Sequence, residues 1–141
     1  MDTKVENEEK KEYLNRYRIA SRKIKSLQEQ RESLMIEKRN AKAIQYSDMP
    51  HGNKQSDLSD YIAALDSLEE RIGESIRERM KARVDIEKGI IYVRDGIESD
   101  ILRKRYIELK SWECICNEIG YSWKETHRKH GKALQDFKIM T

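Results

Sequence analysis

The sequence contains few of the residues that interrupt helices and few of those that build a thick core. Among 141 residues there are one proline, one phenylalanine, two tryptophans and six glycines. Charged residues make up 39% of the chain and hydrophobic residues 37%, which is too apolar for full disorder and too charged for a large globular core. These proportions predict an all-α protein with long, largely exposed helices.

Long apolar runs and cysteines are scarce as well. No apolar run approaches the ~18 residues that a membrane span requires, and no signal peptide is recognisable. Two cysteines are too few for a disulfide framework. We therefore expect a protein of a reducing, cytoplasmic compartment that makes no membrane contact.

Charge of neither sign predominates. Lysine and arginine number 29 against 26 acidic residues, so the net charge is only +3. Basic residues exceed acidic ones in residues 1–50 and 97–141, and the reverse holds in residues 51–96. This distribution suits two arms that pair with each other and a mildly anionic partner. The first dozen residues are highly charged and are expected to fray.

Two long helices are predicted in the first 94 residues. Apolar or small residues recur every three or four positions from Tyr13 to Ala41, and again from Leu58 to Val93. Between these stretches, the segment YSDMPHGNKQS combines the only proline with a glycine and an asparagine, which predicts a loop over residues 46–56. We predict a first domain, residues 1–95, that forms a long antiparallel helical hairpin with arms at ~10–45 and ~57–94. Its apolar seam is also a candidate homodimer surface.

The second predicted domain, residues 96–141, consists of short helices. Gly96 ends the second arm, Ser99 is the expected cap of the next helix, and Gly120 permits a left-handed turn. Ser122 and Glu125 have the spacing of a capping box. The predicted helices are Ser99–Glu108, Ser111–Ile119 and Ser122–Phe137.

The last of these helices is predicted to be amphipathic. Its apolar or small positions fall on one side: Thr126, His130, Ala133, Leu134 and Phe137. The other side carries Lys124, His127, Arg128, Gly131 and Gln135. The basic excess of this helix has the right sign for phosphate binding, although any surface helix has a charged face.

Residues 111–134 hold both cysteines and two of the three histidines, so a metal site or a redox site has to be considered. Cys114 and Cys116 lie two positions apart on a helix and point about 200° away from each other, so they cannot share an ion or form a disulfide. Neither has an evident orienting partner for nucleophilic catalysis. We expect no metal, no cofactor and no catalytic residue, and hence a protein that is not an enzyme.

The C-terminal stretch ILRKRYIELKSWECICNEIGYSWKETHRKHGKAL resembles the fourth region of sigma-70-type factors. The matching residues are Leu102, Arg105, Tyr106, Glu113, Ile115, Gly120, Ser122, Ala133 and Leu134. Leu109 stands where those factors usually have glycine. With its predicted hairpin and its YSDMP motif (residues 46–50), the chain as a whole resembles a family of small phage proteins akin to the ArpU and RinA regulators of late genes.

The resemblance implies a helix-turn-helix whose recognition helix enters the major groove of promoter DNA, with RNA polymerase as a second partner. The candidate DNA-binding residues carried over are Lys124, Glu125, His127, Arg128, Lys132, Arg105 and Lys110. Arg128 suits a bidentate guanine contact, and Glu125 can accept from cytosine if capping does not occupy it. Two alternatives stay open: a DNA-packaging protein like a terminase small subunit, and a coiled-coil scaffold that binds protein.

Overall fold

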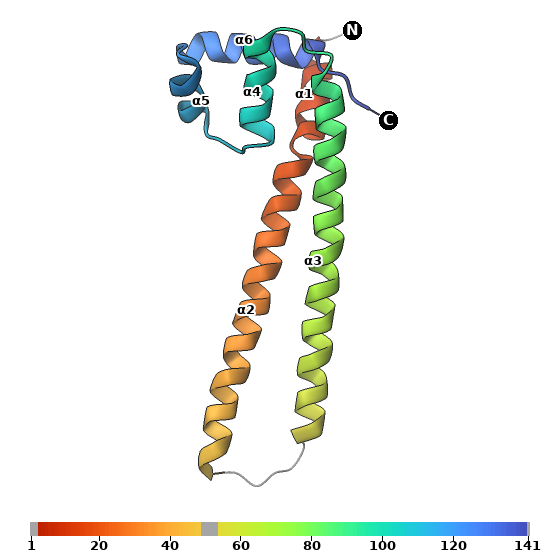
Figure 1. The fold of residues 1–141 in the computed structure, drawn as a ribbon, viewed down its shortest axis with the longest axis vertical. Helices are drawn as coiled ribbons and strands as arrows, with labels where there is room; N and C mark the ends of the chain where they lie inside the picture. The colour runs from red at the N-terminus through yellow and green to blue at the C-terminus, as the bar shows by residue number, and fades with distance from the viewer. Residues whose placement is uncertain (1–2, 49–53, 141) are drawn as a thin grey trace. The chain divides into compact units, whose positions relative to one another are not determined.

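Helices account for nearly all of the chain that the computed structural model describes, which is residues 3–48 and 54–140 (Figure 1). The helices are α1 (Thr3–Leu14), α2 (Arg16–Asp48), α3 (Lys54–Ile90), α4 (Gly96–Tyr106), α5 (Trp112–Ile119) and α6 (Trp123–Asp136). No strand occurs in these two described ranges, so the prediction of an all-α fold is confirmed. Within them, no helix combines the length and the apolar character needed to cross a bilayer.

The chain divides into two compact units, each described by itself. Unit 1 comprises residues 1–20 and 78–141, and unit 2 comprises residues 21–77. The predicted domain boundary after residue 95 does not coincide with this division. The reason is that the end of α3 belongs to the same packed body as the three C-terminal helices, and so does the beginning of the chain.

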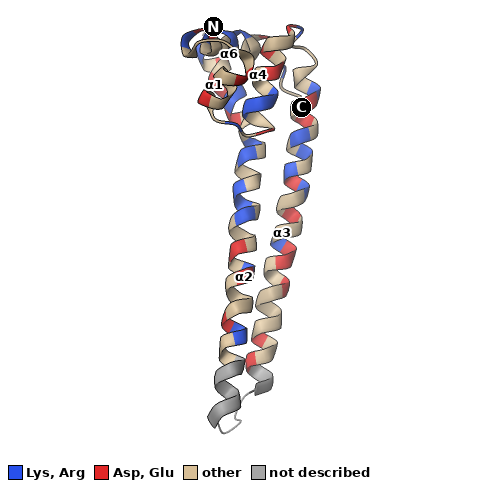
Figure 2. Ribbon diagram, turned by 60° about the vertical axis from the view of Figure 1, so that its left-hand side comes forward, with Lys and Arg blue, Asp and Glu red and all other residues tan. Residues whose placement is uncertain are grey.

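Unit 2 is an antiparallel pair of helical segments from α2 and α3. Arg31 of α2 forms an ion pair of 3.0 Å with Glu69 of α3, and Lys38 lies 4.4 Å from the ring centroid of Tyr61. Because the partner numbers fall on α3 as they rise on α2, the two segments run in opposite directions. Residues of both charge signs occur along each helix (Figure 2).

The apolar seam of unit 2 is thin. Its buried residues are Ile24, Leu27, Ile72 and Ser75. Leu58, where the predicted apolar repeat of this arm begins, is 45% exposed, and Ile62 is 48% exposed. The predicted loop is shorter at both ends, since α2 continues to Asp48 and α3 begins at Lys54; the rest of it lies outside the described residues.

Unit 1 has one contiguous core, built from helices that are distant in sequence. The core residues are Leu14, Ile86, Ile90, Val93, Leu102, Tyr106, Ile107, Ala133, Leu134 and Phe137. Burying ten such side chains in one cluster is the main source of stability in a small domain. The side chains of Tyr13 and Tyr17 pack against this cluster.

The charged first residues do not fray as expected. Residues 3–14 form α1, which packs against α6. The Lys10 ammonium donates to the carbonyl oxygens of Leu134 (2.8 Å) and Gln135 (3.1 Å), where α6 has carbonyl groups without helical partners. The Tyr13 ring lies 5.9 Å from that of Phe137. The prediction of fraying is wrong because the charged residues of α1 do not by themselves indicate that α6 packs against them.

The end of α3 is shaped by a close backbone contact. A Cβ atom at Gly89 would lie 2.3 Å from the Phe137 ring and 2.4 Å from the Lys138 carbonyl oxygen. The Phe137 side chain is 1% exposed and lies directly over this glycine. Helix α3 continues through Gly89 to Ile90. The role of Gly89 is to let the residues after α6 approach α3.

Asp95 caps the beginning of α4. The Asp95 carboxylate accepts from the N–H groups of Ile97 (3.0 Å) and Glu98 (2.9 Å), so α4 begins at Gly96. Ser99 was predicted to be this cap, and that prediction is wrong. Ser99 lies inside the first turn, where its hydroxyl donates to the Gly96 carbonyl. Asp95, followed three residues later by Glu98 in the first turn, is the sequence pattern that indicates this cap.

Candidate nucleic-acid interface

Helices α5 and α6 are joined by a short turn with well-defined caps. The Ser111 hydroxyl oxygen accepts from the Cys114 N–H at 3.2 Å and starts α5. Gly120 ends it in the left-handed region, with φ 75°. The Ser122 hydroxyl oxygen then accepts from the Glu125 N–H at 3.1 Å and starts α6. The predicted helix starts and the predicted left-handed glycine are confirmed.

One face of α6 is fully buried in unit 1, as its pattern predicted. Thr126 and Ala133 are 0% exposed, Leu134 is 1% exposed and His130 is 6% exposed. This face packs against α4 and α1. The helix is therefore held along its length with its opposite face directed to solvent. The Thr126 hydroxyl is buried without a hydrogen-bond partner among the described residues.

Aromatic and histidine side chains support the first half of α6. A hydrogen bond of 2.8 Å joins Tyr106 Oη and His130 Nε2. The Trp112 ring centroid lies 4.7 Å from that of His130 and 4.5 Å from that of His127, and the Trp123 ring centroid also lies 4.5 Å from that of His127. These contacts tie α4 and α5 to the beginning of α6.

The two histidines lie near two positive charges, Lys11 and Arg105. A cavity of about 210 Å³ beside them is lined by Lys11, Asn15, Arg105, Tyr106, Trp112, His127 and His130. Burial lowers the pKa of His130 to about 3, and the nearby charges of Lys11 and Arg105 act in the same direction. Burial also lowers the pKa of His127 and raises that of Tyr106 to about 12. His130 is therefore neutral at pH 7.

His127 differs in position from the other candidate contacts on α6. Its side chain is half-buried and contacts both indole rings, and its Nε2 atom is inaccessible and has no hydrogen-bond partner among the described residues. The helical pattern placed His127 on the open side. His127 packs against Trp123 of its own helix and Trp112 of α5, and the contact between helices cannot be read from the sequence pattern of α6.

The solvent face of α6 carries cations at one-turn spacing. Lys124, Arg128 and Lys132 are all exposed. Trp123, at the first helical position, is 58% exposed beside them. The Glu125 carboxylate accepts hydrogen bonds from Nε and Nη2 of Arg128. This interaction lowers the pKa of Glu125 and raises that of Arg128.

The two candidates outside α6 have partners within unit 1. The Arg105 guanidinium lies 4.9 Å from the Trp112 ring centroid and donates to the Lys110 carbonyl at 3.1 Å. The Lys110 ammonium forms ion pairs with Glu118 (2.6 Å) and Glu108 (3.0 Å). The hydrogen bond with Glu118, followed by that with Glu108, raises the pKa of Lys110. Neither side chain is as available to an outside phosphate as Lys124 or Lys132.

The turn before α5 contains a residue in the left-handed region, Leu109, at the position where sigma-type sequences usually have glycine. Leu109 lies at φ 58°, the only non-glycine residue with a positive φ in the described part of the chain. The Lys110 N–H bonds back to the Lys104 carbonyl at 2.9 Å and closes the turn. A leucine here adopts a conformation that costs about 1–2 kcal/mol for most residues.

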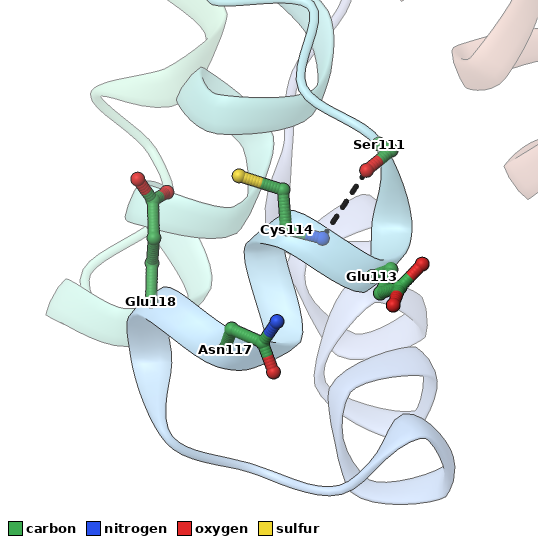
Figure 3. Close-up of a pocket in the computed structure, with 5 residues that line it drawn as sticks. All are labelled: Ser111, Glu113, Cys114, Asn117 and Glu118. Carbon is green, nitrogen blue, oxygen red and sulfur yellow. Dashed lines mark hydrogen bonds between the residues drawn. The ribbon is translucent and has the colours of Figure 1, made fainter.

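The exposed side of α5 forms an open depression with no catalytic arrangement. It is lined by Ser111, Glu113, Cys114, Asn117 and Glu118 (Figure 3). The Ser111 hydroxyl is engaged in the helix cap, and no histidine accompanies the cysteine. Both cysteines are free and half-buried. Among the described residues, no group of three or more metal-ligating side chains comes together.

Comparison of the chain with protein-family models, curated proteins and solved structures gave no match. The candidate interface therefore rests on the residues and geometry of this chain alone.

Proposed function

We propose that the chain is a sequence-specific DNA-binding protein that acts as a phage or prophage transcription regulator. In this proposal α5 and α6 form a helix-turn-helix, and α6 is the recognition helix in the major groove. RNA polymerase and a second copy of the chain are proposed as further partners.

The observation that carries the proposal is the way α6 is held. One face is buried against α4 and α1, and both ends are capped, by Ser122 at the beginning and by Lys10 at the end. Lys124, Arg128 and Lys132 project on the other face, each one helical turn of roughly 6 Å from the next. A rigid helix with a row of cations and an open face is what major-groove reading requires.

The exposed residues of α6 have different proposed roles. Arg128 has the forked donors that fit guanine O6 and N7, so it specifies sequence. Lys132 lies further along the helix and contacts phosphate, which positions the protein without reading sequence. Arg105 and Lys110 contribute less, because the Trp112 ring and two carboxylates already engage them.

The test is selection of a target from random duplexes, followed by competition binding against a scrambled duplex over a salt series. Arg128→Ala is expected to lower the preference at one base pair by about tenfold. Lys132→Ala is expected to weaken binding to every sequence and to reduce the salt slope by about one unit. Lys25→Ala, an exposed lysine of unit 2, is the charge-matched control. A wild-type protein that shows no preference between duplexes refutes the sequence-specific function.

A protein partner is the second candidate, and the ion pairs of unit 1 favour it. Carboxylates already neutralise Lys110 and Arg128, which removes charge that DNA would otherwise attract. The exposed Trp123 is a residue type enriched at protein interfaces. Failure to bind any duplex at low salt, together with salt-insensitive binding of a protein, would establish this alternative.

A further inference from the structure

We propose that Glu125 is a positioning residue that fixes the Arg128 guanidinium for reading a guanine, and that Glu125 does not itself read a base. This inference rests on the proposed function, because it concerns how the same face of α6 distinguishes sequences. The sequence left open whether the Glu125 carboxylate accepts from cytosine.

The contact between the two side chains is side-on. Arg128 Nε lies 3.0 Å from Glu125 Oε2 and 3.2 Å from Oε1, and Arg128 Nη2 donates to Oε1. A guanidinium carries five N–H groups in one plane. The side-on contact uses the Nε hydrogen and the Nη2 hydrogen next to it. The remaining Nη2 hydrogen and the parallel Nη1 hydrogen form the outer edge, which the carboxylate leaves open.

That outer edge is the one a guanine needs. Guanine presents O6 and N7 as neighbouring acceptors in the major groove, and two parallel N–H donors match them. With Arg128 bound through its inner edge, both oxygens of Glu125 already accept hydrogen bonds from the guanidinium. The pair therefore acts as one unit that donates through its outer edge, which fits the two acceptors of a guanine better than the amino group of a cytosine.

The backbone that carries the Glu125 carboxylate is fixed at the start of α6. The Glu125 N–H bonds to the Ser122 hydroxyl oxygen, and the next residue, Thr126, is fully buried. Glu125 is half-buried, whereas Arg128 is exposed. The contact with the less exposed Glu125 thus restrains the more exposed Arg128 side chain, so less side-chain entropy is lost when Arg128 meets its base.

If Glu125 has a positioning role, its removal should raise the affinity for DNA of any sequence and lower the discrimination between sequences. The carboxylate offsets the Arg128 charge, so its removal should strengthen binding to any phosphate backbone. The same removal frees the guanidinium to adopt other rotamers, so discrimination at the guanine should fall. An acidic residue that only repels DNA would produce the first effect without the second.

The experiment compares Glu125→Gln with Asp136→Asn in the full-length chain. The glutamine keeps the length of the side chain and the backbone cap at Ser122. Asp136 is an exposed acid at the other end of the same helix, and its substitution removes the same charge. Binding is measured on the selected target, on targets changed at single base pairs and on a scrambled duplex.

We expect Glu125→Gln to bind the scrambled duplex more tightly while its preference for one G·C pair falls by about fivefold, the most that an exposed ion pair imposes. In an Arg128→Ala background the same substitution should leave that preference unchanged. Arg128→Lys, which keeps the charge but lacks the fork, should lose the preference and retain affinity for the scrambled duplex.

Two results overturn the inference while leaving the proposed function intact. One is an unchanged preference in Glu125→Gln, as expected for Asp136→Asn. The other is a loss that persists without Arg128, which would mean that Glu125 reads a base itself. If the wild-type protein prefers no duplex, the proposed function fails and the inference fails with it.

Discussion

The two units use the same helix, α3, in different ways. In unit 2, α3 contributes one side of a thin seam, and residues predicted to be buried, such as Leu58, are half exposed. In unit 1, α3 supplies Ile86, Ile90 and Val93 to a core that also contains residues from both ends of the chain. The difference shows that the heptad pattern predicts a helix in both units but predicts packing density in neither.

A glycine pair on α3 gives the sharpest test of this difference. Gly89→Ala places a methyl group within 2.4 Å of the Phe137 ring and the Lys138 carbonyl, so we expect it to destabilise unit 1 by about 3 kcal/mol. At Gly73 in unit 2 the nearest atom would be Arg77 Nη1 at 3.6 Å. Gly73→Ala should therefore stabilise α3 by about 1 kcal/mol through helix propensity alone.

Two probes of chemical denaturation separate the units. Both tryptophans, Trp112 and Trp123, belong to unit 1, so their fluorescence follows that unit, whereas circular dichroism follows all helices. Equal effects of the two alanine substitutions would show that the contact between Gly89 and Phe137 does not constrain the fold.

Acid sensitivity is the second expected contrast. The pKa of His130 is lowered to about 3 by burial, from 6.5 when exposed. The unfolded chain therefore takes up a proton first, and stability that is complete above pH 6.5 is lost as the pH falls toward 3. We expect unit 1 to lose about 1.4 kcal/mol per pH unit in this range, or about 2 kcal/mol at pH 5.

The measurement is fluorescence-detected denaturation between pH 5 and pH 7, where most carboxylates are ionised. His130→Gln should remove most of the pH dependence, and His127→Gln should remove less, since His127 is only half-buried. Unit 2 has no histidine among its described side chains, so its unfolding should change little. If the stability of unit 1 does not change with pH, His130 takes up a proton as readily in the folded chain as in the unfolded chain.

Local signals in the sequence were sufficient for much of the candidate interface. Ser111 and Ser122 cap α5 and α6 as predicted, and Gly120 takes the left-handed conformation that its position indicated. The buried face of α6 also follows directly from its period, with Ala133 and Leu134 inside. Caps, turns and periodicity depend on residues within one or two helical turns, which is why the sequence contains them.

Contacts between distant segments could not be predicted in this way. Nothing near Lys10 indicates that it reaches the last carbonyls of α6, more than 120 residues later. The same holds for the approach of Phe137 to Gly89, since a glycine inside a helical pattern does not name the residue that packs against it. His127 also depends on Trp112 from another helix. Each of these requires the three-dimensional arrangement before its partner can be named.

The buried hydroxyl of Thr126 predicts a smaller, stabilising substitution. Its Oγ1 atom has no hydrogen-bond partner among the described residues, and the side chain is 0% exposed. Thr126→Val replaces that hydroxyl by a methyl group of similar shape, so we expect unit 1 to gain about 1 kcal/mol. Ser75→Ala is the matched change in unit 2, where another hydroxyl is buried without a partner in the described structure. Destabilisation by Thr126→Val would indicate a hydrogen bond from Oγ1 to water.

The smallest expected effect concerns the two left-handed residues that flank α5. Leu109→Gly relieves a φ of 58°, worth about 1–2 kcal/mol, but it increases the entropy of the unfolded chain by about 0.4–1 kcal/mol and removes a half-buried side chain. We expect a net change within about 0.5 kcal/mol of zero. Gly120→Ala is the control: no atom lies within 4 Å of its Cβ, so only backbone strain acts, and the loss should be about 1 kcal/mol. If Leu109→Gly instead costs more than Gly120→Ala, as measured by tryptophan fluorescence during denaturation, the packing of the Leu109 side chain outweighs its strain. The leucine would then stabilise the turn that precedes α5.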